Sequence, residues 1–321
     1  RFKRVTFANI RNFLEFILTL DPNKPHFMHK SGFVNIIGNP NVGKSTLMNA
    51  LVGEKLSIIT SKAQTTRHRI LGIVNGDDFQ IVFSDTPGIL KPCYKLQESM
   101  MNFVRGALSD ADVLLYVTDT VERDDERAAE IIDRIRQSGV PTLVVVNKID
   151  LTTQEALEAL VEKWRATLPD AEIIPISARE GFNIAGLFDR ILALLPEGEP
   201  FYPKDTLTDK TLRFFASEII REKILKFYDK EIPYCCEIEI ESYKEEPTID
   251  RIAATIYVAR DSQKGILIGH KGEKLKRVGQ TAREDMEQFL GKKVFLQLFV
   301  KVSDDWRNNE RQLRRFGYEQ E

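Results

Sequence analysis

The sequence predicts two folded domains, a doubly wound α/β domain with a mostly parallel sheet and a smaller α+β domain that follows it. Three observations predict this division. Short apolar segments alternate with helical patterns from Phe33 to Leu195, a proline-rich segment follows, and the pattern of elements then changes. With 321 residues, the chain is long enough for two domains that each have a hydrophobic core.

Five short strands are expected in the first domain. They are apolar along most of their length, which is typical of strands that are buried on both faces of a parallel sheet. The expected strands are Phe33–Ile37, Gln80–Ser84, Val113–Val117, Thr142–Val146 and Ile173–Ile176. Helical patterns lie between them, for example Arg127–Gln137 and Gln154–Thr167. In such sheets, ligands bind at the carboxyl ends of the strands.

The segment PEGEPFYPKD, from Pro196 to Asp205, contains three prolines and a glycine and is typical of a linker. We therefore expect the α/β domain to span residues 29–195, the linker 196–207 and the second domain 208–321. Residues 1–28 precede the pattern, and we expect an extension there, either a misassigned start upstream of Met28 or a poorly ordered segment. A transit peptide is the alternative, because basic residues outnumber acidic ones in it.

The second domain has a different order of elements, helix–strand–strand–helix–helix–strand. A long amphipathic helix is expected first, and a short terminal helix is expected last. The expected elements are Thr208–Phe227, Cys235–Tyr243, Arg251–Val258, Gly265–Leu267, Glu273–Leu290, Val294–Val302 and Asp305–Phe316.

Bulk properties exclude some classes of protein. The formal net charge of −2 excludes a uniformly basic nucleic-acid binder, although it allows a local basic face. Only three cysteines occur, two of them adjacent, so we expect neither a disulfide framework nor a cysteine metal site. No apolar segment reaches the ~18 residues that a membrane span needs.

A phosphate-binding loop, GNPNVGKS, directly follows the first expected strand and opens a helix. Its glycines allow backbone N–H groups to surround phosphate oxygens, and the helix N-terminus adds partial positive charge. Lys44 should reach the β- and γ-phosphates, and Ser45 should bind Mg²⁺. The expected nucleotide-binding residues here are Gly38, Asn39, Pro40, Asn41, Val42, Gly43, Lys44, Ser45 and Thr46.

A second motif, DTPG, comprises Asp85, Thr86, Pro87 and Gly88 and closes the next buried strand. Asp85 is expected to hold Mg²⁺ through water, and the N–H of Gly88 to sense the γ-phosphate. The polar segment from Ser61 to Arg69 is where a switch loop should lie, with one threonine that completes the Mg²⁺ shell. Thr66 is the favoured ligand and Thr65 the alternative. We expect catalysis to depend on Lys44, Thr66 and Gly88.

Base recognition is expected from two motifs at later strand ends. NKID contains Asn147, Lys148 and Asp150, and SAR contains Ser177, Ala178 and Arg179. The carboxylate of Asp150 can accept hydrogen bonds from N1–H and from the exocyclic amine of guanine, which adenine does not offer in that arrangement. A site built for such donors rejects a base that lacks them by a factor of ~10⁴, so GTP or GDP is expected rather than ATP.

The residue after Gly88 is Ile89, where many GTPases have a glutamine that orients the attacking water. Isoleucine cannot do this. Hydrolysis is therefore expected to be slow, or the water is positioned by the backbone, by a monovalent cation or by a partner. Asn41 is a candidate ligand for K⁺ beside the phosphates.

The second domain contains GHKG, a Gly-x-x-Gly loop of the type with which KH domains clamp single-stranded RNA. From Arg260 to Arg283 there are seven basic residues and two acidic ones, a local charge of +5. This concentration fits a surface that faces phosphates. The element order matches a type II KH domain. The expected RNA-binding residues are Gly269, His270, Lys271, Gly272, Lys274, Lys276 and Arg277.

From Lys30 to Tyr318 the sequence resembles the Era family of bacterial GTPases. The resemblance rests on GNPNVGKSTLMNAL, KAQTTRHRILGI, DTPG, NKID, PISAREG, ASEIIREKI, GHKGEKLK and VKVSDDWRNNERQLRRFGY. It implies a monomeric cytoplasmic protein that binds the 3′ end of 16S rRNA through its KH domain and assists maturation of the small (30S) ribosomal subunit. It also implies peripheral association with the inner membrane, and the departure at Ile89 is normal for the family.

Two other functions remain open from the residues alone. One is an RNA-binding module whose nucleotide domain is mainly structural, which predicts equal RNA affinity with GTP and GDP. The other is a membrane-associated signalling GTPase whose basic surface meets anionic lipids.

Overall fold

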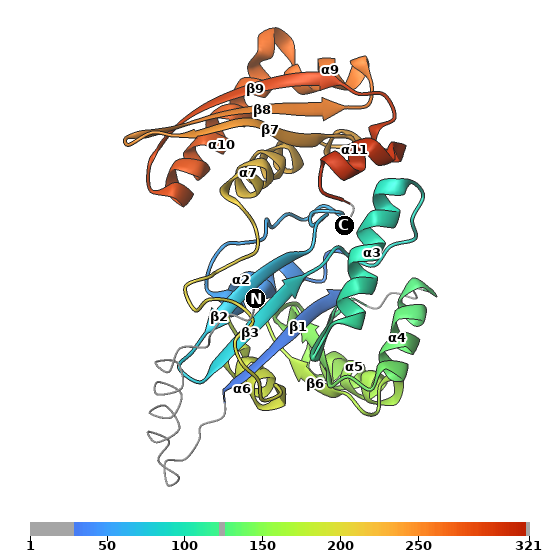
Figure 1. Ribbon diagram of the computed structural model, residues 1–321. Coiled ribbons are helices and arrows are strands. Elements are labelled where there is room, and N and C mark those ends of the chain that lie inside the picture. The colour runs from blue at the N-terminus through green and yellow to red at the C-terminus, as the bar shows by residue number, and fades with distance from the viewer. Residues whose placement is uncertain (1–28, 122–125, 319–321) are drawn as a thin grey trace, which may run out of the picture.

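The structure is a computed structural model that describes residues 29–121 and 126–318. The expected N-terminal extension, residues 1–28, lies outside the described residues. Figure 1 shows a lower α/β unit with a six-stranded sheet and an upper unit with a three-stranded sheet. No helix among the described residues is long and apolar enough to cross a membrane.

Five of the six strands of the larger sheet run parallel, and the sixth, at one edge, runs antiparallel to its neighbour. In spatial order the strands are β2 (Ile70–Asn75), β3 (Phe79–Asp85), β1 (Lys30–Gly38), β4 (Val113–Asp119), β5 (Thr142–Asn147) and β6 (Glu172–Pro175). The five parallel strands are those that the sequence predicts, within a few residues at their ends. The sequence analysis did not predict the edge strand β2.

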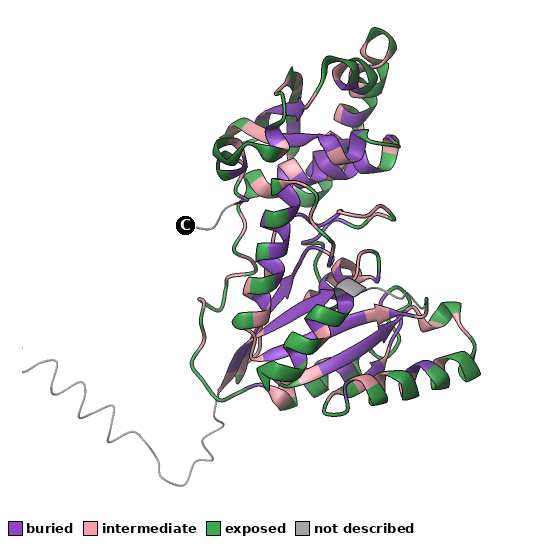
Figure 2. Ribbon diagram, turned by 90° about the vertical axis from the view of Figure 1, so that its right-hand side faces the viewer, coloured by how far each residue is buried: buried purple, intermediate pink, exposed green. Residues whose placement is uncertain are grey.

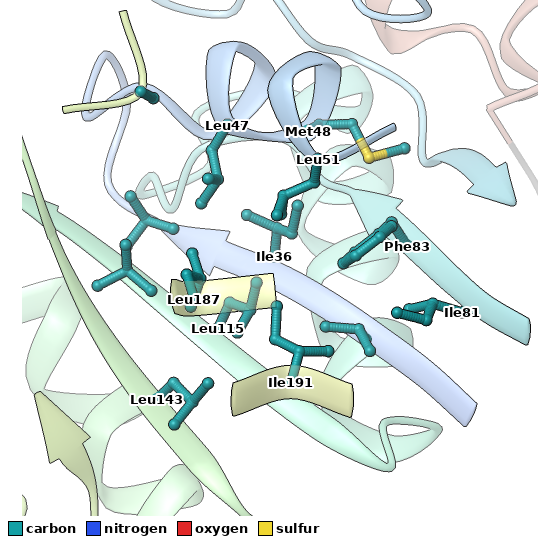
Figure 3. Close-up of a cluster of buried hydrophobic side chains, with 14 of the residues drawn as sticks. Ile36, Leu47, Met48, Leu51, Ile81, Phe83, Leu115, Leu143, Leu187 and Ile191 are labelled. Carbon is teal, nitrogen blue, oxygen red and sulfur yellow. The ribbon is translucent and has the colours of Figure 1, made fainter. Parts of the chain in front are cut away.

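The helices of this unit cover both faces of the sheet, as expected for a doubly wound fold. They are α2 (Lys44–Val52), α3 (Lys95–Ser109), α4 (Glu126–Ser138), α5 (Gln154–Thr167) and α6 (Ile184–Leu194), with a short 3₁₀ turn η1 (Ile149–Leu151) after β5. On one face, α2 and α6 pack against Ile36, Phe83 and Leu115 (Figure 3). On the other face, α3, α4 and α5 pack against alternate residues such as Leu114 and Val144.

The upper unit has the predicted order helix–strand–strand–helix–helix–strand, with short additional turns. Its elements are α7 (Leu212–Phe227), α8 (Ile232–Cys235), β7 (Glu237–Glu245), β8 (Ile249–Val258), α9 (Asp261–Ile268), η2 (His270–Gly272), α10 (Glu273–Leu290), β9 (Lys293–Val302), η3 (Trp306–Asn308) and α11 (Glu310–Arg315). In the sheet, β8 lies between antiparallel β7 and parallel β9. The terminal helix expected near Asp305–Phe316 is present as α11, but it is shorter than expected, because the separate 3₁₀ turn η3 precedes it.

The segment 196–207, expected as a linker, lies along the larger sheet. The N–H of Ser31 in β1 donates to the carbonyl of Pro196 at 3.1 Å, and the N–H of Ile73 in β2 donates to that of Leu207 at 2.8 Å. The side chain of Gln80 in β3 forms two hydrogen bonds with the backbone of Tyr202. The segment is therefore attached to the α/β unit by backbone pairing.

Helix α7 lies between the three-stranded sheet and the α/β unit (Figure 1). Near its first turn, Phe215 is buried in the same cluster as Leu47 and Leu51 of α2. A second contact forms where Phe103 of α3 packs with Tyr318 near the C-terminus. Figure 2 shows buried residues in both sheets and in the helices that cover them. Apolar packing at these two contacts, as well as the connecting chain, holds the two units together.

The switch segment also reaches the upper unit. The fully buried guanidinium of Arg67 donates hydrogen bonds to the carbonyls of Cys236 at 2.7 Å and Pro233 at 3.1 Å. It also forms an ion pair of 3.0 Å with Glu237, whose carboxylate accepts a hydrogen bond from the hydroxyl of Tyr318 at 2.6 Å. The residue next to Thr66 is thus bound to the second unit.

Candidate functional site

The phosphate-binding loop connects the end of β1 at Gly38 to the start of α2 at Lys44. A Cβ atom at Gly38 would lie 2.1 Å from the carbonyl oxygen of Val117, and one at Gly43 would lie 2.2 Å from Nδ2 of Asn147. Their φ angles of 149° and 99° also favour glycine. Only glycine therefore allows the loop to approach its neighbours this closely.

A cavity of about 490 Å³ lies beside this loop. It is lined by Pro40, Asn41, Gly43, Lys44, Ser45, Thr46, Ile58, Ile59, Thr60, Ser61, Gln64, Thr65, Thr66, Gly88, Lys148 and Arg179. The phosphate-binding loop, the switch segment, DTPG, NKID and SAR all contribute to this lining. Segments spread over about half of the sequence therefore meet at one cavity.

The ammonium group of Lys44 is buried within the loop. It donates hydrogen bonds to the carbonyls of Gly38 at 3.0 Å and Asn39 at 2.8 Å. Burial lowers the pKa of Lys44 to about 8, although the nearby carboxylate of Asp85 opposes this shift. The lysine is thus fixed at the cavity wall, where an added anion would favour its charged form.

Ser45, Thr66 and Asp85, the three predicted magnesium ligands, lie together. The hydroxyl of Ser45 donates to Asp85 Oδ2 at 2.7 Å and lies 2.8 Å from the hydroxyl of Thr66. Thr66 lies 3.4 Å from the same carboxylate oxygen. The hydroxyl of Thr65 instead contacts Thr60 and the carbonyl of Lys62, both at 2.6 Å. This geometry favours Thr66 over Thr65.

The oxygen donors fit Mg²⁺, a hard cation that prefers carboxylate, hydroxyl and water ligands. The second carboxylate oxygen of Asp85 is buried and accepts no hydrogen bond from the described residues. Burial raises the pKa of Asp85, while hydrogen bonding from Ser45 and the charge of Lys44 oppose the shift. A buried carboxylate with an unpaired oxygen is stabilised by a nearby cation.

The DTPG segment connects β3 to the cavity. The hydroxyl of Thr86 donates to the carbonyl of Ile36 at 2.7 Å, and Pro87 is buried. Gly88 lines the cavity, whereas the side chain of Ile89 turns into the core and is 1% exposed. Ile89 packs there with α3 and α4, so this position supplies no polar group to the cavity.

Asn147 joins two loops on the side of the cavity where base recognition is expected. Its side-chain amide donates to the carbonyl of Val42 at 2.9 Å and accepts from the N–H of Ala178 at 2.9 Å. The amide is buried and uses both its donor and its acceptor. NKID thereby holds the SAR segment in register with the phosphate-binding loop.

Asp150 presents an exposed carboxylate at the carboxyl end of β5. One of its oxygens accepts a hydrogen bond of 2.6 Å from the hydroxyl of Ser177, which is 1% exposed. Arg179 is exposed at the cavity. Ser177 orients the carboxylate, which leaves its remaining lone pairs for a base.

Asp119 is a supporting residue that the sequence analysis missed. Lys148, in a left-handed conformation with φ of 63°, donates to Asp119 at 2.9 Å and to the carbonyl of Asn41 at 2.5 Å. Asp119 is buried at the end of β4. One feature of the sequence could have revealed it. Asp119 ends an apolar strand, and polar residues at the carboxyl ends of such strands are candidates for the site.

The GHKG loop lies between α9 and α10. Gly269 and Gly272 have φ angles of 72° and 80°, and Lys271 between them is also left-handed at 48°. A Cβ atom at Gly269 would lie 2.7 Å from Cγ of Lys274. The turn therefore requires glycine at its first position and presents backbone that a polynucleotide can approach closely.

The predicted RNA-binding cations surround this turn. His270, Lys271, Lys274, Lys276 and Arg277 are all exposed. The guanidinium of Arg277 lies 4.4 Å from the ring centre of Phe227, and the ammonium of Lys274 lies 5.9 Å from that of Tyr228. These aromatic rings at the end of α7 hold two of the cations on the surface beside the loop.

Comparisons with family models divide the chain in the same way. A model described as "50S ribosome-binding GTPase" matches residues 33–148, and a model described as "KH domain" matches residues 231–307. GTPase Era of Alkaliphilus metalliredigens is 46% identical over 293 residues, which cover 91% of this chain and 99% of that protein. GTPase Era of Syntrophus aciditrophicus is 47% identical over 293 residues, 91% of this chain and 96% of that protein.

Two solved structures are similar along most of the chain. One is Era in complex with MgGDPNP and nucleotides 1506–1542 of 16S ribosomal RNA. The other is a variant of Aquifex aeolicus Era bound to GDP·AlF4⁻. Each has a TM-score of 0.87 and 42% sequence identity, and each match covers 91% of this chain and 100% of the other.

Proposed function

The chain belongs to the Era family of GTPases, with a P-loop GTPase domain and a C-terminal KH domain, and from this premise we propose a specific function for it. It binds GTP with Mg²⁺, hydrolyses GTP to GDP and phosphate, and binds the 3′ end of 16S rRNA to assist assembly of the 30S subunit. The observation that carries the proposal is the single cavity lined by all five nucleotide motifs. We assign residues 29–195 to the GTPase domain, 196–207 to the linker and 208–321 to the KH domain.

The residues of the cavity have distinct roles in this proposal. Lys44 contacts the β- and γ-phosphates, and the N–H of Gly88 contacts the γ-phosphate. Ser45 and Thr66 are direct ligands of Mg²⁺, and Asp85 holds it through water. Mg²⁺, when bound, neutralises the charge that develops on the phosphate oxygens. Transfer to water then depends on positioning and electrostatics rather than on a covalent intermediate.

The attacking water needs a group other than the residue after Gly88. The side chain of Ile89 is buried in the core and cannot reach it. We propose that backbone at Gly88 and a K⁺ ion held by Asn41 replace the missing glutamine. Asn41 is exposed at the cavity, and its side chain forms no hydrogen bond with any of the described residues. Hydrolysis in KCl should exceed hydrolysis in NaCl, and Asn41→Ala should remove the difference.

Guanine specificity is assigned to the carboxylate of Asp150. Its bond from Ser177 fixes one oxygen, while Asn147 and Ala178 hold the surrounding loops. Phosphate release should occur with GTP and not with ATP. Equal rates with both nucleotides would contradict the assignment.

The RNA surface is proposed to consist of the GHKG turn and its flanking cations, Lys274, Lys276 and Arg277. The test is fluorescence anisotropy with an oligonucleotide of the 16S rRNA 3′ end. His270→Asp together with Lys271→Asp should abolish binding because two acidic groups would face the phosphates. The control, Gln154→Asp with Arg165→Asp, makes the same charge change on exposed positions of α5. Equal losses in both variants would contradict a local site.

The localisation that we propose is the cytoplasm, with peripheral association of the monomeric protein to the inner membrane. Support comes from the same basic surface, because cations near a membrane attract anionic headgroups. Co-sedimentation with vesicles of phosphatidylglycerol tests this part. If binding survives in the His270→Asp, Lys271→Asp variant, the lipid and RNA surfaces are different.

A further inference from the structure

Tyr228, the residue after α7, contacts both helices that flank the GHKG loop. Its side chain is 4% exposed, and its hydroxyl donates a hydrogen bond of 2.6 Å to the carbonyl of Leu267. Leu267 lies in the last turn of α9, where carbonyl groups lack helical partners, two residues before Gly269. The same aromatic ring faces the ammonium of Lys274 at 5.9 Å. Tyr228 thus constrains the loop from both sides.

The backbone of Tyr228 is bound in turn by the switch segment. Lys62 donates a hydrogen bond to the carbonyl of Tyr228 and forms an ion pair of 2.8 Å with Asp229. The carbonyl of Lys62 accepts a hydrogen bond of 2.6 Å from the hydroxyl of Thr65. Lys62 is therefore braced against the residue that precedes Thr66, the magnesium ligand that we propose.

Helix α7 itself forms a second connection to the same segment. Arg221 donates to the carbonyl of Thr65 and, at 3.4 Å, to that of Gln64. Its guanidinium is fixed by Glu218, with an Nε to Oε1 distance of 2.7 Å. The switch segment thus contacts α7 at Arg221 and, through Lys62, the chain just beyond the helix at Tyr228. A helix of 16 residues is a rigid rod of ~24 Å, so these two contact points move together.

We infer that Tyr228 is a positioning residue that transmits the position of the switch segment to the RNA-binding loop. A shift of Thr66 upon GTP binding or hydrolysis moves Lys62 and Arg221, these move the end of α7, and the hydroxyl of Tyr228 moves the end of α9. The inference rests on the proposed function and deepens it, because it names the contact through which nucleotide controls RNA affinity. Coupling of this kind requires that the two nucleotide states place the segment differently.

The test uses the full-length protein and the 16S rRNA 3′-end oligonucleotide, with a non-hydrolysable GTP analogue and with GDP. The measured quantity is the ratio of the two RNA dissociation constants. Tyr228→Phe keeps the ring beside Lys274 and removes only the bond to Leu267. Because one such hydrogen bond changes an equilibrium by about fivefold, the ratio should move toward unity by about this factor. Nucleotide affinity should stay within twofold of the wild type.

Two further variants separate a positioning role from a structural one. Tyr243→Phe is the matched control, since it removes a tyrosine hydroxyl bonded to Asp250 at 3.0 Å in the same domain. It should leave the ratio unchanged. Lys62→Met breaks the same path at the switch segment and should reduce the ratio as Tyr228→Phe does. The double variant should show no additional loss, because both changes break one path.

The outcomes distinguish this inference from the proposed function. If the wild type shows a nucleotide-dependent ratio that both Tyr228→Phe and Lys62→Met retain, the inference is overturned and the proposed function stands. If the wild type binds the RNA equally in both states, the inference is overturned while RNA binding stands. If the wild type binds no RNA, both fail. Thermal unfolding of each variant verifies that the fold is intact.

Discussion

Replacing Arg67 by methionine should strongly destabilise the protein. The side chain of Arg67 is fully buried, and its ion-pair partner Glu237 is 8% exposed. Methionine keeps most of the aliphatic volume but leaves the Glu237 carboxylate with the hydroxyl of Tyr318 as its remaining side-chain partner. The carbonyls of Pro233 and Cys236 also lose a charged donor.

The magnitude follows from what remains buried. Removing one partner of a buried ion pair costs about 3–5 kcal/mol, because the other charge stays without compensation. We therefore expect the free energy of unfolding to fall by about 3–5 kcal/mol. Urea denaturation measures this loss, with the fluorescence of Trp306 as a local probe. Trp306 is fully buried and donates a hydrogen bond to the carbonyl of Cys235 at 2.9 Å, close to the cluster.

A double-mutant cycle tests the electrostatic reason. Arg67→Met combined with Glu237→Gln contains no uncompensated charge, so the double variant should be more stable than the sum of the single losses by about 1–3 kcal/mol. The control is Arg134→Met, which breaks an exposed ion pair with Glu130 at 2.9 Å and should cost less than about 1 kcal/mol. The reasoning would be refuted if Arg67→Met lowered the free energy of unfolding by less than about 1 kcal/mol while the radius of gyration in solution stayed unchanged.

Three other changes have definite expected outcomes. Asp150→Asn replaces an acceptor by a donor at the base, so affinity should fall for GTP and rise for xanthosine triphosphate, as measured by competition with a fluorescent nucleotide. Ile89→Gln should not accelerate hydrolysis, because the side chain points into the core, and it should cost about 2–4 kcal/mol of stability in urea denaturation. An alkylating reagent at pH 8 should modify Cys93 alone, because burial raises the pKa of Cys236 to about 12 and also raises that of Cys235.

Each of these expectations can fail in a specific way. Unchanged preference of Asp150→Asn for GTP would show that another group reads the base. Faster hydrolysis by Ile89→Gln would show that the side chain can leave the core and reach the nucleotide. A raised pKa lowers the fraction of reactive thiolate at any pH below that pKa, so Cys235 and Cys236 should react slowly at pH 8. Mass spectrometry should find three modified cysteines only after unfolding, and rapid modification of Cys236 in the folded protein would contradict its burial.

Local sequence patterns predicted most of the α/β unit, and the exceptions have physical causes. The strand Val113–Asp119 was predictable because both of its faces are buried and its residues are correspondingly apolar. The strand Ile70–Asn75 was not predicted, although four of the six residues of ILGIVN are apolar, because Gly72 interrupts the segment and it continues directly from the polar switch segment. The terminal helix was expected near Asp305–Phe316 but begins only at Glu310, because Asn309 is extended and its side chain caps the helix there.

The nucleotide site shows how far spacing alone reaches. The motifs name Ser45, Thr66 and Asp85, because each follows a strand or belongs to the loop between strands. The sequence analysis already favoured Thr66 over Thr65, and the hydroxyl contacts of the folded chain support that choice. Asp119 has no motif of its own, and its role depends on the pairing of β4 with β5, which brings it to Lys148.

The sequence by itself determined the family, the fold of each unit and the residues that form each motif, because these depend on local order along the chain. The tertiary structure decided how the two sites are connected. Lys62 and Arg67 belong to the motif KAQTTRHRILGI, but nothing in the sequence pairs them with Tyr228 and Pro233, which lie 166 positions further along the chain. Such contacts depend on how the two units pack. Packing brings together residues that are far apart in the sequence, so no local sequence pattern predicts these contacts.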